Sequence, residues 1–272
     1  MGAMLQGLML DIGRTALTTA DLVRDKPLWA VAADVPAHLA AADMAARGID
    51  VAPLIELPVQ RYVTRKDLEQ ADRRPVAQVS LQMADAERIG EDAPLAAALE
   101  VLRHRKFVFV MHREHTTGIV TRADLEQPIV GLHVFGLILS LEAAIDELLA
   151  EREQRQWLGV LSDDRRQRIV DLYDERRCED TDLDLLRSLN LDDRLTIVRK
   201  LGLHDAIGFG SVRDFRRWSE RLKRIRNALA HGSTLLTAVP DPTEALGILR
   251  QLRQGASLPL SGHHDTSATP GC

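Results

Sequence analysis

The sequence predicts two domains of different classes, an α+β domain followed by an all-α helical bundle. Two observations lead to this fold class. A segment of the first half recurs 57 residues later, and each copy carries helical and strand-like patterns. From about residue 129 the strand patterns stop and apolar residues recur at helical spacing. We therefore expect an α+β domain over residues 1–128, with copies at about 15–70 and 77–128, a helical domain over 129–255 and a flexible tail over 256–272.

The internal repeat is clearest near the end of each copy. Residues 62–70 read YVTRKDLEQ, and residues 119–127 read IVTRADLEQ. Upstream, an Asp-x-Pro triplet precedes an alanine-rich helical segment in each copy, at residues 34–36 and 92–94. We expect the aspartate to be the N-cap of that helix and the proline to lie in its first turn.

Strand candidates follow this helix in each copy. Apolar runs at residues 50–55 and 107–111 predict buried strands, and a second strand leads to the Thr-x-x-Asp sequence that opens another helix. Each copy is therefore expected to fold in the order helix, strand, strand, helix.

The two copies together resemble a pair of CBS motifs, the type first described in cystathionine β-synthase. The second copy fits best, through the run GIVTRAD at residues 118–124. In that family the Thr and Asp hold the phosphate and ribose of an adenine nucleotide. The resemblance thus implies AMP, ADP or ATP as a regulatory ligand, bound by Gly118, Thr121 and Asp124 and by Thr64 and Asp67 of the first copy.

The physical chemistry of this motif allows two interpretations. A Thr hydroxyl and free amides at a helix N-terminus favour an anion, and a carboxylate can accept from both ribose hydroxyls. The same Thr-x-x-Asp spacing is also a common way to cap a helix. The first copy departs from the family pattern, because Arg61 stands where Gly118 stands in the second. A glycine permits close approach of a ligand, whereas the arginine either blocks the site or grips phosphate.

Helices are expected throughout the second half. Apolar residues at spacings of three and four predict a long amphipathic helix over 129–150. Further helices are expected over 163–177, 192–201, 212–230 and 242–255, from their periodicity and their Gly, Asp and Pro boundary residues. The most apolar stretch ends at Glu142, so we expect it to be too short to span a bilayer and predict no membrane partner.

The helix predicted over 212–230 combines an apolar stripe with many arginines. Arg217, Arg221 and Arg224 are candidate RNA contacts on its polar side. A solvated surface is the alternative interpretation of the same charges. The formal net charge of −5 argues against electrostatic capture of nucleic acid by the whole chain, although not against a local basic patch.

The end of that helix, LKRIRNALAHG at residues 222–232, resembles the signature of HEPN domains. These all-α domains dimerise with their motifs facing each other, and catalytic members cleave RNA without a metal or other cofactor. The resemblance implies a homodimer with Arg226, Asn227 and His231 as the catalytic residues. Histidine can move the proton of the 2′-hydroxyl, and arginine can stabilise charge on the transition state. Alternatively, Arg226 pairs with a carboxylate such as Glu142, and His231 only interacts with the helix dipole.

Few other features bear on function. The two cysteines, Cys178 and Cys272, indicate neither a disulfide framework nor a zinc site, and no metal site is predicted. No secretory signal is evident, so we expect a cytoplasmic protein. The two resemblances together predict a nucleotide-regulated, metal-independent endoribonuclease that acts as a toxin or defence effector. The alternative is a non-catalytic module that senses an adenine nucleotide and regulates or assembles other components.

Overall fold

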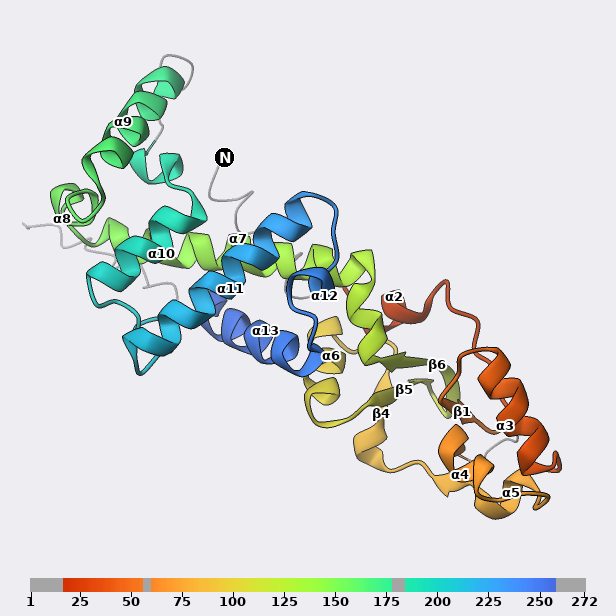
Figure 1. The fold of residues 1–272 in the computed structure, drawn as a ribbon. Coiled ribbons are helices and arrows are strands. Elements are labelled where there is room, and N and C mark those ends of the chain that lie inside the picture. The colour runs from red at the N-terminus through yellow and green to blue at the C-terminus, as the bar shows by residue number, and fades with distance from the viewer. Residues whose placement is uncertain (1–16, 56–59, 178–183, 258–272) are drawn as a thin grey trace, which may run out of the picture. The chain divides into compact units, whose positions relative to one another are not determined.

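The computed structural model describes residues 17–55, 60–177 and 184–257. These residues divide into two compact units, with the boundary between residues 130 and 131. We call them the repeat unit (residues 17–130) and the helical unit (residues 131–257). Figure 1 shows the strands confined to the repeat unit.

The repeat unit contains two three-stranded sheets and short helices. Its elements in chain order are α2 (Thr19–Val23), α3 (Ala37–Ala46), β1 (Val51–Pro53), β2 (Arg61–Thr64), α4 (Arg65–Glu69), α5 (Val76–Val79), β3 (Leu81–Gln82), η1 (Asp85–Glu87), β4 (Arg88–Gly90), α6 (Leu95–His104), β5 (Phe107–His112), β6 (His115–Thr121) and η2 (Arg122–Glu126).

Both copies show the predicted order of helix, strand, strand and helix. In the first copy these elements are α3, β1, β2 and α4, and in the second they are α6, β5, β6 and η2. The first sheet has the order β1-β2-β3 and is antiparallel. The second has the order β4-β5-β6, in which β4 is parallel to β5 and β6 is antiparallel to it. The sequence analysis did not predict the outer strands β3 and β4, which are only two and three residues long.

The two copies pack against each other through side chains of both sheets. Tyr62 of β2 contacts Phe107 and Phe109 of β5, with ring centroids 5.5 and 5.2 Å apart. Buried apolar residues of both copies surround these rings. The residues before α3, which the sequence analysis placed in the first copy, join the second, because Thr19 donates its amide to the carbonyl of Ala93 at 2.8 Å. They therefore complete the second copy.

The expected helix caps of α3 and α6 were wrong. The N-cap positions are occupied by Pro36 and Pro94, both extended, and not by Asp34 and Asp92. The first helical amide of each helix bonds to a main-chain carbonyl from elsewhere in the unit, at 2.8 and 2.9 Å. Tertiary main-chain pairing thus replaces the side-chain cap that local sequence suggests.

The described residues of the helical unit contain helices and no strand. The elements are α7 (Pro128–Ala150), which begins in the repeat unit, α8 (Gln154–Leu158), α9 (Asp163–Arg177), η3 (Leu185–Ser188), α10 (Leu191–Lys200), α11 (Val212–Ala230), α12 (Leu235–Ala238) and α13 (Pro242–Ala256). The five predicted helices appear within one residue of their expected ends. The three elements that were not predicted have five residues or fewer. The expected tail lies, from residue 258 onward, outside the described residues.

The long helix α7 corrects the expectation that the apolar segment before Glu142 is too short to span a bilayer. The helix continues through this residue to Ala150, and its 23 residues include a window of mean hydropathy 1.9. By length and composition alone it could cross a membrane, yet 56% of that window is buried within the protein. Burial of this extent is typical of the central helix of a bundle. The absence of a membrane partner stays a prediction.

A buried ion pair joins α7 to α10. Arg194 is 6% exposed, and its Nε and Nη2 donate to the two carboxylate oxygens of Asp146 at 2.7 Å each. The same guanidinium donates to the carbonyl oxygen of Leu186 in η3 at 3.1 Å. Burial raises the pKa of Asp146, and hydrogen bonding to Arg194 lowers it. The guanidinium thus neutralises the Asp146 carboxylate and also donates to main-chain carbonyls. A buried guanidinium needs such partners for its charge and for its N–H groups.

Close packing explains one glycine of the motif and generates a stability prediction. A Cβ atom at Gly118 would lie 2.6 Å from Cβ and Cγ1 of Val23 in α2. We expect Gly118→Ala to lower the free energy of unfolding by about 1–3 kcal/mol through overpacking. The matched control is Gly247→Ala in α13, where a Cβ would meet no atom within 4 Å, and which should stabilise by about 0.5–1 kcal/mol. Urea denaturation of both variants tests this, and an unchanged midpoint for Gly118→Ala would contradict it.

Candidate functional site

The repeat unit contains a cavity of about 510 Å³ between its two copies. It is lined by the connector before α3, by the start of β1, by Thr64 at the end of β2 and by the ends of β6 and α6. The lining residues are Lys26, Pro27, Leu28, Trp29, Gly48, Ile49, Asp50, Val51, Thr64, Lys106, Phe107, Ile119, Thr121, Arg122 and Ala123. Both copies contribute, and the two Thr residues of the repeated motif are both present.

Apolar and aromatic side chains form much of the cavity wall. Trp29 is half-buried, and the guanidinium carbon of Arg47 lies 5.8 Å from the centre of its ring. Phe107 is half-buried at the start of β5 and packs against Tyr62. Flat apolar surfaces of this kind accept an aromatic ring by stacking.

The charges of the wall leave a positive balance. Asp50 accepts from Nη2 of Arg65 at 2.6 Å, so its charge is compensated outside the cavity lining. Lys106 is exposed and forms no ion pair with the described residues. Arg122 donates from Nε to the carbonyl of Leu102 at 3.1 Å. Lys106 therefore gives the cavity a positive charge that can attract an anion.

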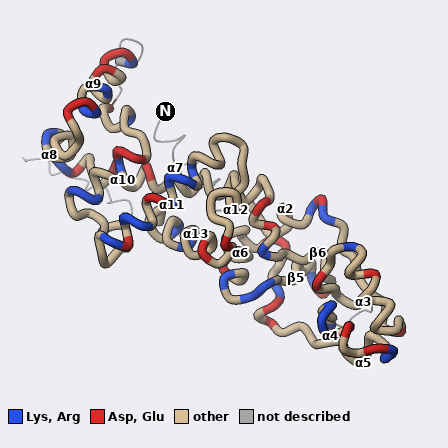
Figure 2. The backbone as a smooth tube through the Cα atoms, viewed as in Figure 1, with Lys and Arg blue, Asp and Glu red and all other residues tan. Residues whose placement is uncertain are grey.

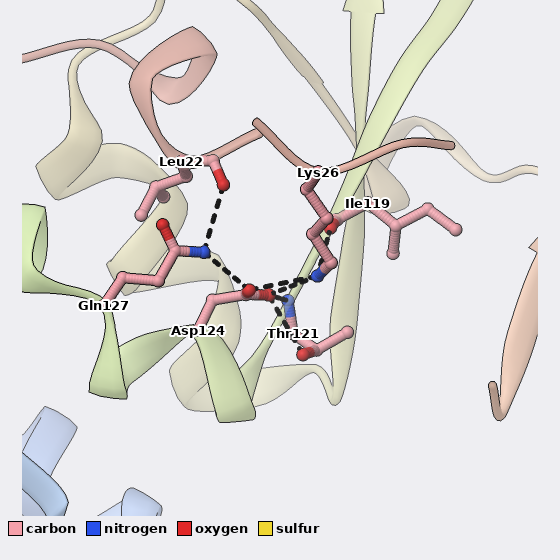
Figure 3. A network of polar contacts seen from close by, with 6 residues as sticks. All are labelled: Leu22, Lys26, Ile119, Thr121, Asp124 and Gln127. Carbon is pink, nitrogen blue, oxygen red and sulfur yellow. Dashed lines mark hydrogen bonds and ion pairs between the residues drawn. The ribbon is translucent and has the colours of Figure 1, made fainter. Parts of the chain in front are cut away.

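The third cation of the wall, Lys26, is held by Asp124. Its Nζ lies 3.0 Å from each carboxylate oxygen and 3.2 Å from the carbonyl oxygen of Ile119 (Figure 3). The same carboxylate accepts from the amide and hydroxyl of Thr121 at 2.6 and 3.0 Å, and from Nε2 of Gln127 at 2.7 Å. Asp124 is 7% exposed. This carboxylate is thus saturated by donors of the protein itself.

The first copy repeats this geometry in a simpler form. Thr64 caps α4 by accepting from the amide of Asp67 at 3.2 Å, and its hydroxyl donates to the Asp67 carboxylate at 2.6 Å. Arg61, at the position equivalent to Gly118, donates from Nη2 to the carbonyls of Ala77 and Ser80 at 3.1 and 2.9 Å. This arginine therefore supports the turn after α5 and does not line the cavity.

The structure brings together only part of the predicted nucleotide site. Thr64 and Thr121 line the cavity, whereas Asp67, Asp124 and Gly118 are not among its lining residues. Both Thr hydroxyls donate to their own Asp side chains, so in this state they can only accept hydrogen bonds from a ligand. The space beside Gly118 that the sequence analysis expected to admit a ligand is taken by Val23, as described above.

Sequence reasoning missed the residues that give the cavity its character. They are Lys26, Trp29, Lys106 and Phe107. A compositional signal was present, because the chain has only five lysines and three tryptophans and the cavity contains two of the former and one of the latter. No local pattern links the two pairs, since Lys26 and Trp29 lie in the connector between α2 and α3, and Lys106 and Phe107 lie at the start of β5.

The residues of the predicted RNA-cleaving site lie at the end of α11. Arg226, Asn227 and His231 are all exposed, and His231 is the C-cap, followed by Gly232 at φ +74°. Nη1 of Arg226 lies 3.4 Å from Oδ1 of Asn227. The helix is regular through Ala230. Five residues therefore separate the directions of Arg226 and His231 by a rotation of about 140° about the helix axis. No hydrogen bond joins them within the described part of the chain, and a shared site would need a second chain.

A half-buried carboxylate lies within electrostatic range of Arg226. Burial raises the pKa of Glu142 on α7, Arg194 and Arg226 lower it, and Asp146 raises it. No ion pair is formed between Glu142 and Arg226 in the described residues. The alternative interpretation of Arg226, as a partner of Glu142, is therefore supported as a long-range interaction only.

The predicted RNA contacts are not equivalent in the structure. Arg217 and Arg224 are exposed on α11 and form no ion pair with other described residues. Arg221 is held by Glu244 of α13, because the two helices pack side by side and bring these groups into contact. Within residues 17–55, 60–177 and 184–257, no group of three His, Cys, Asp or Glu side chains could hold a metal ion.

Comparisons with known proteins find similarity to solved structures only. No protein-family model and no curated protein matches the chain. The structure is similar to that of a CBS domain (15% identity, 39% of this chain and 93% of that one, TM-score 0.34). It is also similar to an uncharacterized conserved protein from Pyrococcus horikoshii (18% identity, 36% and 81%, TM-score 0.32). A third is the CBS domain of a CBS domain-containing membrane protein from Sphaerobacter thermophilus (15% identity, 45% and 93%, TM-score 0.35).

The unequal roles of the two motif aspartates can be measured. Asp124→Ala removes the acceptor for Lys26, Thr121 and Gln127, so we expect the free energy of unfolding to fall by about 2–4 kcal/mol. Asp67→Ala is the matched change in the first copy and should cost about 0.5–2 kcal/mol, because Thr64 still caps α4. Chemical denaturation of the two variants tests the difference. Equal losses would show that the Asp124 network adds nothing beyond a helix cap.

Proposed function

We propose that the repeat unit is a CBS-type regulatory module whose cavity binds a phosphorylated adenine nucleoside. The observation that carries this proposal is the cavity itself, which lies between the two copies and includes the Thr residue of each repeated motif. Its volume of about 510 Å³ lies within the range of about 300–1,000 Å³ typical of small-molecule sites.

The wall chemistry suits the three parts of such a ligand. Trp29 and Phe107 provide flat surfaces for the adenine ring. The oxygen atoms of Thr64 and Thr121 can accept from ribose hydroxyls, since each Thr proton is committed to an Asp. Lys106, which is exposed and forms no ion pair with another described residue, attracts the phosphate. In this arrangement Asp124 positions Thr121 and Lys26, and the ligand contacts those two residues in its place.

Regulation follows from where the cavity lies. A ligand that contacts both copies stabilises their packing, and it shifts any equilibrium in which the bound arrangement is favoured. The ligand is thus proposed to act on whatever process the helical unit performs or assembles. The size of this effect cannot exceed the difference in binding free energy of the ligand between the two arrangements of the copies.

Thermal denaturation with a panel of AMP, ADP, ATP and S-adenosylmethionine tests the proposal. A ligand at a hundredfold excess over its Kd adds about 2.7 kcal/mol to the free energy of unfolding, and this raises the melting temperature. We expect Lys106→Ala to abolish most of the shift. Lys66→Ala on α4 is the control, because this exposed lysine lies outside the cavity lining. No shift with AMP, ADP or ATP, or a shift with S-adenosylmethionine alone, would refute the adenine-nucleotide proposal.

Metal-independent RNA cleavage is a second candidate function, for the helical unit. One observation favours it: Arg226, Asn227 and His231 are exposed together at one end of α11, so water and RNA can reach them. Because Arg226 and His231 diverge within one chain, the proposed site is composite and requires a homodimer in which each partner supplies groups to the other.

Cleavage of labelled RNA in the presence of EDTA tests this second candidate. We expect activity in the wild type and a loss of at least about 100-fold in both Arg226→Ala and His231→Ala, since proton transfer contributes on that order. Arg250→Ala, an exposed arginine of α13, is the control. Identical rates in all four proteins would identify a contaminating nuclease and exclude the proposed site.

A further inference from the structure

The helical unit has a strongly basic surface that the nucleotide proposal does not involve. α11 contains seven Arg or Lys residues and two acidic ones, in a chain whose formal net charge is −5. Figure 2 shows the basic stretches of this helix in blue. A hollow of about 340 Å³ along α11 is lined by Arg213, Arg216, Arg217, Glu220, Arg221 and Arg224.

Four arginines of this hollow have no acidic partner. Arg213, Arg216, Arg217 and Arg224 are exposed, and none takes part in an ion pair with another residue that the structure describes. We call these four residues the arginine array. Their positions on one helix place Arg213 and Arg224 about 16 Å apart along the helix axis.

The nearby acids already have other partners, and Asp214 accepts from the hydroxyl of Ser211 at 2.8 Å. Glu220 lies 2.8 Å from Nζ of Lys223, which also contacts Asp192 at 2.8 Å. Glu244 binds Arg221. The protein therefore neutralises the basic residues beside the array and leaves the array itself uncompensated. Repulsion among four such charges is relieved by an external anion with several charges.

The surroundings of the array argue against two other kinds of partner. A membrane-binding helix inserts an apolar face beside its basic one, but the apolar face of α11, with Phe215, Trp218 and Leu222, is buried in the bundle. The core of a protein–protein interface is depleted of charged residues, whereas the hollow is lined by charged side chains alone.

We propose that the arginine array binds the sugar-phosphate backbone of a nucleic-acid double helix. Guanidinium groups bind phosphates in a bidentate way, and backbone contacts need no particular base sequence. The span of the array exceeds the width of about 12 Å of the major groove of B-form DNA, so arginines at its two ends can reach phosphates on both walls of that groove. No aromatic side chain lines the hollow, so single strands lack the stacking platform that gives them affinity.

Fluorescence anisotropy tests this proposal with the full-length protein. The probes are DNA and RNA duplexes of about 20 base pairs and the corresponding single strands, titrated at salt concentrations between about 50 and 200 mM. Over this range, binding through several phosphate contacts weakens by roughly tenfold or more. The wild type should bind a duplex more tightly than single strands. The array variant Arg213→Gln/Arg217→Gln/Arg224→Gln should lose about 0.9 per arginine in the slope of log affinity against log salt.

A second triple variant controls for net charge. Arg73→Gln/Arg168→Gln/Arg250→Gln removes three exposed arginines from α9, α13 and the turn before α5, and it should keep the wild-type slope. Circular dichroism verifies that both variants are folded. Equal losses in the two variants, tighter binding of single strands, or no duplex binding by the wild type would overturn the proposal. The DNA and RNA arms show which duplex the array prefers. Because the array lies in the helical unit, these outcomes are independent of the nucleotide proposal.

Discussion

The carboxylate of Asp124 is the interaction on which the repeat unit depends. It is 7% exposed and binds Lys26 from the connector after α2, Thr121 at the end of β6 and Gln127 at the end of η2. A buried carboxylate is tolerated only when donors compensate for its lost hydration. Here the compensation joins segments about a hundred residues apart in the chain. The motif that resembles a ligand site is therefore also a structural junction.

This junction determines which charges remain for a ligand. Lys26 lines the cavity, but its charge is balanced by Asp124, and Asp50 is balanced by Arg65. The positive charge that remains available on the wall is then that of Lys106. A ligand phosphate placed near Lys26 would compete with Asp124 for the same ammonium group. Such competition would link occupancy of the cavity to the packing of the connector against β6, which is the kind of coupling that a regulatory module requires.

The sequence was sufficient for the helices and the repeat, and it was insufficient for the cavity. The helix α11 was predicted to the residue, because its apolar periodicity extends from Phe215 to Leu229. The caps at Asp34 and Asp92 were wrong, because main-chain carbonyls from distant segments occupy the role that local sequence assigns to a side chain. Trp29 and Lys106 could not be found by pattern, since only tertiary folding brings their connectors together. Gly118 was identified, but its reason is the packing of Val23 and not the approach of a ligand.

The pairing of arginines separates structural charges from those that remain free to bind. Arg194 and Arg165 each make two hydrogen bonds to one carboxylate, with Asp146 and Asp193, and hold α7, α9 and α10 together. A cation paired in this way has little affinity for an external anion. If it exchanged partners, its carboxylate would be left with an uncompensated charge at a site with little access to water. The array on α11 has the opposite character, with exposed guanidinium groups and no internal acceptor. Sequence composition treats all thirty arginines alike, and only the fold distinguishes those that stabilise the bundle from those that face a partner.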